Sequence, residues 1–355
     1  MADPDQWVDA LHGYAYDSFN PDALAGARVK NGWLVLASGA SYGALVVPLP
    51  HPMNPEGVLS DASAARIEAL RAAGCVVPQL PWSEADFASL GIERDAVVPA
   101  GTAWCHRRSE REDTDIYFLA NQTDSARTFT ASLRIGDRRP EVWNPMTGTI
   151  DPRPAWRRTA GRTEVELTLA AGESAFVLFA ERCREDAGEA PQVAVTRQPL
   201  GVETWTVEFA ETGIVWTCSE LFDWSQEADE RIRYYSGTAT YTGEFESDAP
   251  KNGERIMLQL GALHDVAEVR VNGCDCGIVW TAPYEVDVTE ALSDGRNLLE
   301  IEVANTWANA LLGADRGKAP FGGIWTNAPY RRAERSLLPA GLLGPLSIEK
   351  RTQRQ

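Results

Sequence analysis

The hydrophobic period changes along the chain and divides it into three regions. In the first, residues 1–107, apolar runs at Trp33–Leu36 and Ala44–Pro48 predict strands. A Ser60/Asp61 cap followed by periodic apolar residues to Ala73 predicts a helix that stops at Gly74. Cys75–Val77 then predicts a short buried strand. A strand, a helix and a strand in this order are typical of a parallel sheet, so we expect a partial, flavodoxin-like α/β segment.

The second region, residues 108–190, has a period of two. Short runs of alternating apolar and polar residues are separated by Gly, Asn and Pro turns, as expected for a small antiparallel β-sandwich. The predicted strands are Ile116–Ala120, Thr128–Ile135, Glu141–Trp143, Glu164–Leu169 and Ser174–Phe179. The polar, acidic stretch Cys183–Pro191 is the best linker candidate.

The third region, residues 191–355, is again all β. About eight strands over roughly 160 residues predict a jelly roll. Asn272-Gly273 lies between two such runs and is the strongest hairpin signal of the chain. The predicted fold class is therefore multidomain and mainly β, with the C-terminal jelly roll as its largest part.

Composition and charge narrow the classes of molecule that the chain could bind. The chain has 355 residues, with 33 basic against 51 acidic side chains and a net charge of −18. Such a charge disfavours nucleic acid and anionic membranes, because phosphates are attracted by positive fields. The N-terminus has no signal-peptide pattern, and no apolar run approaches the roughly 18 residues of a membrane helix. The chain also lacks a phosphate-binding glycine motif and zinc-ligand spacing.

Twelve tryptophans make a sugar-binding surface a reasonable expectation, because aromatic rings stack on the apolar faces of sugars and amides hydrogen-bond to hydroxyls. The spacing Asn305-x-Trp307-x-Asn309 would place three side chains on one face of an extended segment. The alternative is that they anchor the loop after the last strand, and that the aromatic residues pack at the sandwich edge. The predicted carbohydrate-binding residues are Trp280, Tyr284, Asn305, Trp307, Asn309 and Trp325, the last within the Gly-rich loop Gly317–Asn327.

No residue is predicted to be catalytic. Hydrolysis of a glycoside needs two carboxylates at a set separation, and single acids mean little among 51. Glu220, Asp223 and Glu285 lie near aromatic residues, but solvated strand edges explain them better. No cofactor is expected. Calcium remains open as a ligand of such sandwiches, although no ligand spacing for it is visible.

Two sets of motifs carry a family resemblance. Val269-Arg-Val-Asn-Gly273, Gly277-Ile-Val-Trp280 and Pro283-Tyr-Glu-Val-Asp-Val-Thr289 resemble the sugar-binding jelly roll of family 2 glycoside hydrolases. A longer ordered set resembles the C-terminal part of glycoside hydrolase family 106, the α-L-rhamnosidases, from about residue 14 to 348. It comprises Tyr16-Asp-Ser-Phe-Asn20, Val35-Leu-Ala-Ser-Gly-Ala-Ser-Tyr-Gly-Ala-Leu-Val-Val-Pro48, Asp115-Ile-Tyr-Phe-Leu-Ala-Asn-Gln-Thr123, Pro140-Glu-Val-Trp-Asn-Pro-Met-Thr-Gly148, Ala304-Asn-Thr-Trp-Ala-Asn309 and Leu338-Pro-Ala-Gly-Leu-Leu-Gly-Pro345.

The resemblance implies a catalytic barrel with acidic residues and a calcium site ahead of these segments. Because such a barrel takes roughly 250 residues, we expect this chain to lack it, and whether the chain is itself an enzyme stays open. The predicted function is the accessory, carbohydrate-binding portion of an α-L-rhamnosidase-like hydrolase of rhamnose-containing glycans, with a separate catalytic barrel chain as a candidate partner. A stand-alone carbohydrate-binding protein and an inactive remnant are the alternatives. Relatives of full length would be exported to the periplasm or outside the cell.

Overall fold

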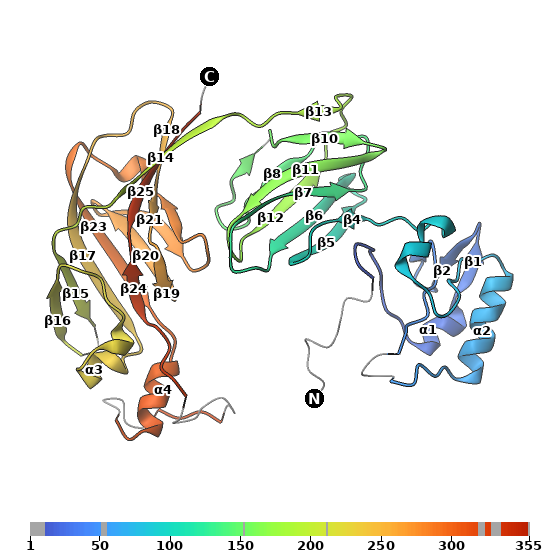
Figure 1. Cartoon of the computed structure of the whole chain (residues 1–355), viewed down its shortest axis with the longest axis horizontal. Coiled ribbons are helices and arrows are strands. Elements are labelled where there is room, and N and C mark those ends of the chain that lie inside the picture. The colour runs from blue at the N-terminus through green and yellow to red at the C-terminus, as the bar shows by residue number, and fades with distance from the viewer. Residues whose placement is uncertain are drawn as a thin grey trace. The chain divides into compact units, whose positions relative to one another are not determined.

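The computed structural model describes residues 11–50, 55–151, 153–210, 212–318, 324–327 and 335–353 (Figure 1). These residues are mainly β. They form two compact units, of which the first comprises residues 1–119, 128–168 and 175–189 and the second the remainder. Three separate clusters of buried apolar residues lie within 24–75, 96–179 and 205–348. The domain boundaries at 107/108 and 190/191 stay predictions.

The N-terminal segment begins with α1 (Pro21–Gly26), capped by the side chain of Asn20. Three strands follow in an antiparallel sheet, and α2 (Asp61–Ala72) then starts at the Ser60 cap and ends before Gly74, as predicted. The strands are β1 (Arg28–Lys30), β2 (Trp33–Val35) and β3 (Ser41–Tyr42).

The expected parallel sheet is present only as one bridge among the described residues. Leu45 donates its backbone N–H to the Val76 carbonyl at 2.9 Å, and Ala44 and Val76 pair in parallel across α2. β1 and β2 are antiparallel instead, because the tight Asn31-Gly32 turn, with both residues at positive φ, cannot return a parallel strand, and β3 also pairs with β2 in antiparallel fashion.

The middle of the chain forms two five-stranded antiparallel sheets with strand orders β13-β10-β11-β7-β4 and β5-β6-β12-β8-β9. Their facing sides bury Tyr117, Leu133, Val165 and Phe179 completely, which confirms the period of two. The strands are β4 (Ala96–Val97), β5 (Thr102–Ser109), β6 (Thr114–Asn121), β7 (Arg127–Leu133), β8 (Glu141–Trp143), β9 (Ile150–Asp151), β10 (Trp156–Thr159), β11 (Arg162–Leu169), β12 (Ser174–Phe179) and β13 (Ala187–Gly188). Two short 3-10 helices, Glu84–Asp86 and Ala88–Leu90, precede them.

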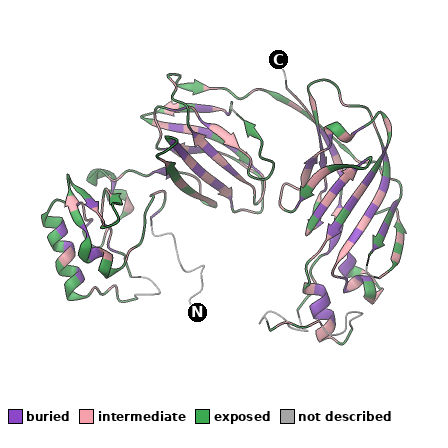
Figure 2. Cartoon of the chain, turned by 180° about the vertical axis from the view of Figure 1, so that it is seen from behind, coloured by how far each residue is buried: buried purple, intermediate pink, exposed green. Residues whose placement is uncertain are grey.

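The C-terminal jelly roll packs a four-stranded sheet, β14-β25-β18-β22, and a six-stranded sheet, β16-β15-β17-β23-β20-β21, around the largest core. Figure 2 shows the alternation of buried and exposed positions along its strands. The Asn272-Gly273 hairpin is confirmed, with Val271 opposite Cys274. A two-stranded sheet pairs β19 with β24. The strands are β14 (Val193–Pro199), β15 (Trp205–Phe209), β16 (Ile214–Cys218), β17 (Thr238–Ser247), β18 (Glu254–Gln259), β19 (Ala262–His264), β20 (Val266–Val271), β21 (Cys274–Val279), β22 (Glu285–Asp287), β23 (Gly295–Ala304), β24 (Gly341–Gly344) and β25 (Ser347–Gln353).

The helical elements of the jelly roll lie between strands: α3 (Glu230–Arg233), α4 (Ala308–Asp315) and 3-10 turns at Trp224–Gln226 and Thr289–Ala291. Within the described residues, none of the helices is both long enough and apolar enough to cross a bilayer.

Candidate carbohydrate-binding surface

One end of the six-stranded sheet gathers most of the predicted sugar contacts. Val279 of β21 and Val303 of β23 both pair with Ala267 of β20, so their backbones lie about 10 Å apart, two strand spacings. Trp280 directly follows the first of these strands, and the segment 305–307 follows the second. The fold therefore brings residues 25 positions apart in sequence to the same sheet end.

Trp280 and Trp307 are the exposed aromatic residues at this end. Their exposed fractions are 58% and 67%. Trp280 shares the outer face of the sheet with Ile278 and Val266, which are also exposed. A flat, accessible indole is the feature that a sugar ring needs for stacking.

The loop that carries Trp307 is held by two side chains that sequence reasoning missed. Asp265 Oδ2 accepts the backbone N–H of Thr306 at 3.0 Å. Ser236 donates its hydroxyl to the Thr306 carbonyl at 2.9 Å. No sequence pattern connects either residue with the segment 305–307, and these hydrogen bonds show the contact.

The two asparagines of the Asn-x-Trp-x-Asn spacing bind backbone. Asn305 accepts the Gly237 N–H at 3.0 Å and donates to the Tyr235 carbonyl at 2.9 Å. Asn309 is 2% exposed and makes a pair of hydrogen bonds with the N–H and C=O of Leu338, at 2.8 and 2.7 Å.

The expected common face of Asn305, Trp307 and Asn309 is therefore wrong. Helix α4 begins at Ala308, so the period of two ends between Trp307 and Asn309, and Asn309 turns into the fold. The alternative role, in which the asparagines anchor the loop after the last long strand, agrees with their contacts.

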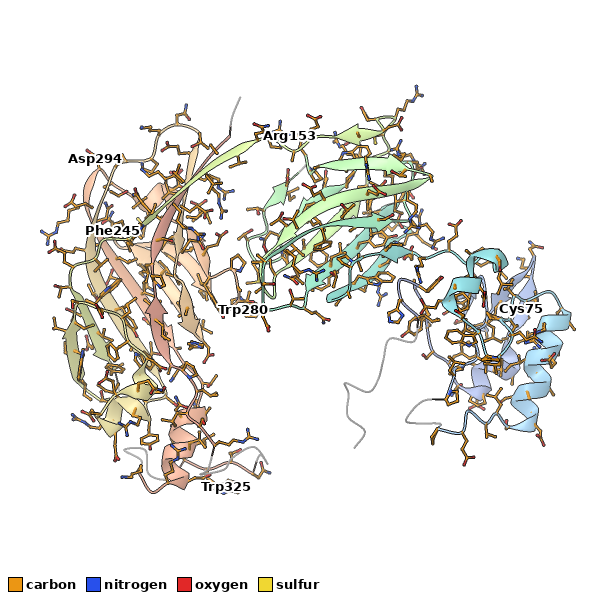
Figure 3. All side chains as sticks on the ribbon, viewed as in Figure 1. Cys75, Arg153, Phe245, Trp280, Asp294 and Trp325 are labelled. Atoms are coloured by element: carbon orange, nitrogen blue, oxygen red, sulfur yellow. The ribbon has the colours of Figure 1, made fainter. Side chains whose placement is uncertain are left out.

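The remaining two predicted residues lie elsewhere. Tyr284 is half-buried and packs against the jelly-roll core. Trp325 is 71% exposed, and Figure 3 shows it well apart from Trp280, toward the end of the unit that carries α4. Part of its loop, 319–323, lies outside the described residues. The structure thus groups Trp280 with Trp307 but not with Trp325.

A surface hollow of about 380 Å³ lies near the opposite ends of β20 and β21. Its acidic residues include Asp287, which pairs with Arg255 at 2.8 Å. Burial acts to raise the pKa of Asp287, but hydrogen bonds from Thr289 and the Arg255 charge outweigh it and lower that pKa. A general acid for glycoside cleavage needs the opposite direction. The hollow is lined by Glu254, Arg255, Cys274, Asp275, Cys276, Asp287, Thr289, Glu290 and Ala291.

Two further acidic residues near aromatic side chains, Glu285 and Asp223, make contacts that stabilise the fold. Glu285 pairs with Arg351 at 2.6 Å. Asp223 caps the 3-10 turn at Trp224 and also accepts the Ala340 N–H at 3.0 Å. In the parts of the chain that the structure describes, no three His, Cys, Asp or Glu side chains are grouped so that they could hold a metal ion.

Comparison with known families agrees with this architecture. The α-L-rhamnosidase model of glycoside hydrolase family 106 matches residues 63–155, from α2 into the first sandwich. The galactose-binding domain-like model of family 2 glycosyl hydrolases matches residues 221–336, which include the sheet end with Trp280 and Trp307.

Two individual proteins extend the comparison. The structure of a rhamnosidase from Novosphingobium sp. PP1Y matches 97% of this chain with a TM-score of 0.78 and 28% identity. A putative beta-glucuronidase from Formosa agariphila is 34% identical over 173 residues, or 41% of this chain. This chain spans 37% of the length of the rhamnosidase and 15% of that of the glucuronidase. By its sequence motifs and its fold, the chain is therefore similar to the α-L-rhamnosidases of glycoside hydrolase family 106 and, over residues 221–336, to the galactose-binding-like domain of family 2 glycosyl hydrolases.

Proposed function

We propose that this chain is the accessory, carbohydrate-binding portion of an α-L-rhamnosidase-like hydrolase and supplies no catalytic carboxylate. The match of 97% of the chain to 37% of a rhamnosidase carries the proposal, because it relates nearly every described element to one part of such an enzyme. A catalytic barrel on a separate chain would be its partner.

The binding surface in this proposal is the sheet end with Trp280 and Trp307. Both indoles are exposed, while the loop beneath Trp307 is fixed by Asp265 and Ser236. A rigid platform reduces the entropy lost on binding. The proposed ligands are rhamnose-containing glycans, since the methyl group and C–H face of a deoxy sugar suit an aromatic surface.

Calorimetric titration of the purified chain with a rhamnose-containing oligosaccharide tests the binding. Trp307→Ala should weaken binding at least tenfold, which corresponds to about 1.4 kcal/mol. Trp325→Ala is the matched control, an equally exposed indole that Figure 3 shows away from Trp280, and should change binding little. Absence of heat at millimolar sugar, or equal affinity of Trp307→Ala, would count against the surface.

The non-catalytic part is tested with an aryl α-L-rhamnoside. We expect no hydrolysis above a buffer control. Turnover that disappears on substitution of one carboxylate, such as Asp287→Asn, would overturn this part of the proposal while leaving the binding surface intact.

A further inference from the structure

A second exposed tryptophan surface lies in the N-terminal segment, far along the chain from the sheet end above. It is the outer face of the sheet β1-β2-β3. The register places Lys30 opposite Trp33, and Arg28, Val35 and Ser41 in the next row across the sheet on the same face. The alternate residues Val29, Leu34 and Tyr42 face the small core formed with α2.

Trp33 is presented on this face as an open platform. It is 53% exposed, although it lies on the central strand of the sheet. Gly43, the residue directly after β3, lies beside it, and a Cβ there would be 3.9 Å from Cζ3 of the indole. With no side chain on that side, the indole can lie across Gly43 and keep its other face open.

Two cations come from the neighbouring edge strand. Lys30 is directly opposite Trp33, and Arg28 lies diagonally from it, so the register places both side chains on the strand next to the indole. Both are exposed, and neither has a side-chain hydrogen bond or ion pair with any described residue. Lys318 and Lys350, by contrast, pair with Glu230 and Asp248.

We propose that this face binds a carboxylate-bearing saccharide, a short uronate oligosaccharide. One face of a uronate ring stacks on Trp33, and its carboxylate lies against the Lys30 ammonium, with Arg28 available to the next residue. A long polyanion such as nucleic acid fits less well, because two cations cannot offset its repulsion by the rest of an acidic chain.

The site is independent of the proposed rhamnoside surface. Trp33 belongs to the first compact unit and Trp307 to the second. Failure of one binding activity therefore leaves the other measurable in the same preparation.

The test is calorimetry of the full chain with tetragalacturonic acid and with its methyl-esterified counterpart, which has the same rings without the charges. We expect the acid to bind at least about tenfold more tightly at low salt, and the difference to shrink at 0.5 M salt. A nucleic acid of equal charge should bind more weakly. Equal affinity for acid and ester, or tighter binding of the nucleic acid, would overturn the proposal.

Variants separate the two contacts. Trp33→Ala should abolish binding of both ligands, and Trp33→Phe should retain a measurable part of it. Lys30→Gln should remove most of the preference for the acid while ester binding stays unchanged. Trp307→Ala is the control and should leave uronate binding as in the native chain. Native-like uronate binding by Trp33→Ala, with its fold verified by circular dichroism, would show that the indole is not the platform.

Discussion

Several asparagine side chains in the jelly roll form hydrogen bonds with backbone groups. Asn305 and Asn309 hold the ends of loops, and Asn297, fully buried, bonds to the Ser293 N–H and to the Ser293 and Gly295 carbonyls. An amide offers a donor and an acceptor in one group, so it can replace a missing strand neighbour. At this scale, composition alone does not separate a sugar-contacting asparagine from a loop anchor.

Asn309→Ala tests that assignment through stability. It removes both hydrogen bonds to the backbone of Leu338, which are partly buried, so we expect a loss of about 1–3 kcal/mol in the free energy of unfolding. The measurement is urea denaturation. Trp307→Ala, at an exposed site two residues away, should change stability by no more than about 0.5 kcal/mol. A stable Asn309→Ala protein that loses sugar binding would contradict the anchoring role.

His106, on β5 of the small β-sandwich, lies between two carboxylates. Its ring nitrogens lie 2.7 Å from Asp95 and 3.0 Å from Asp115, and the ring stacks on Tyr117 with centroids 4.1 Å apart. Burial acts to lower the pKa of His106, but the hydrogen bonds and charges of Asp95 and Asp115 outweigh it and raise that pKa. Arg108 pairs with the other carboxylate oxygen of Asp115, and Arg134 pairs with the other carboxylate oxygen of Asp95.

This network predicts a pH dependence of stability. The contribution of His106 is complete below the unfolded pKa of about 6.5 and is lost as the pH rises through the higher folded value. The thermal midpoint should therefore fall from pH 6.5 upward, and His106→Gln should flatten that slope. His264→Gln, in the second unit, is the control and should keep it. A native protein whose midpoint is constant over this range would refute the prediction.

Among whole elements, the strands with a clean period of two were predictable and the way they pair was not. The strand predicted at Glu164–Leu169 lies within β11, and the one at Ser174–Phe179 coincides with β12, because burial on one face imposes the alternation directly. The pairing of β1 to β3 depends on turn geometry, and the Asn31-Gly32 signal overrides the βαβ pattern around it. Helix α4 was missed because Ala308–Asp315 has no side-chain cap.

Strands β17 and β24 meet through one hydroxyl. Tyr241 Oη accepts the indole N–H of Trp224 at 2.7 Å and the backbone N–H of Leu342 at 3.1 Å. Tyr241→Phe leaves two buried donors unsatisfied, and we expect a loss of about 2–4 kcal/mol in chemical denaturation. Thr240→Val, on the outward face of the same strand, should cost less than about 1 kcal/mol. Equal effects of the two variants would show that the hydroxyl is not a structural joint.

In the whole molecule, there are three buried clusters among the described residues, as there are three regions in the hydrophobic pattern, but the second cluster begins at Ala96, ahead of residue 108. The linker expected at 183–191 is partly structured: Ala187–Gly188 forms β13 against β10, and Gly188 leaves room for the Trp156 indole. Periodicity cannot reveal a two-residue strand. The hydrophobic periodicity could still reveal three separate regions, because each region needs its own apolar interior.

The boundary at 190/191 can be tested by expressing residues 191–355 alone. These residues contain the complete core from Trp205 to Ile348, so we expect one cooperative unfolding transition with near-UV circular dichroism of packed aromatic residues. A molten or insoluble fragment would place the boundary elsewhere, for instance within the loops 120–127 and 169–174, which cluster with the second unit.

The pairing of β14 with β25 has a consequence for evolution. These strands run antiparallel from Val193 opposite Gln353 to Pro199 opposite Ser347, so the entry and exit of the jelly roll are neighbours. A module with adjoining ends can be spliced into a surface turn of an unrelated host without stretching either protein. The paired first and last strands therefore give the jelly roll the geometry of a domain that can be inserted into another protein as one unit.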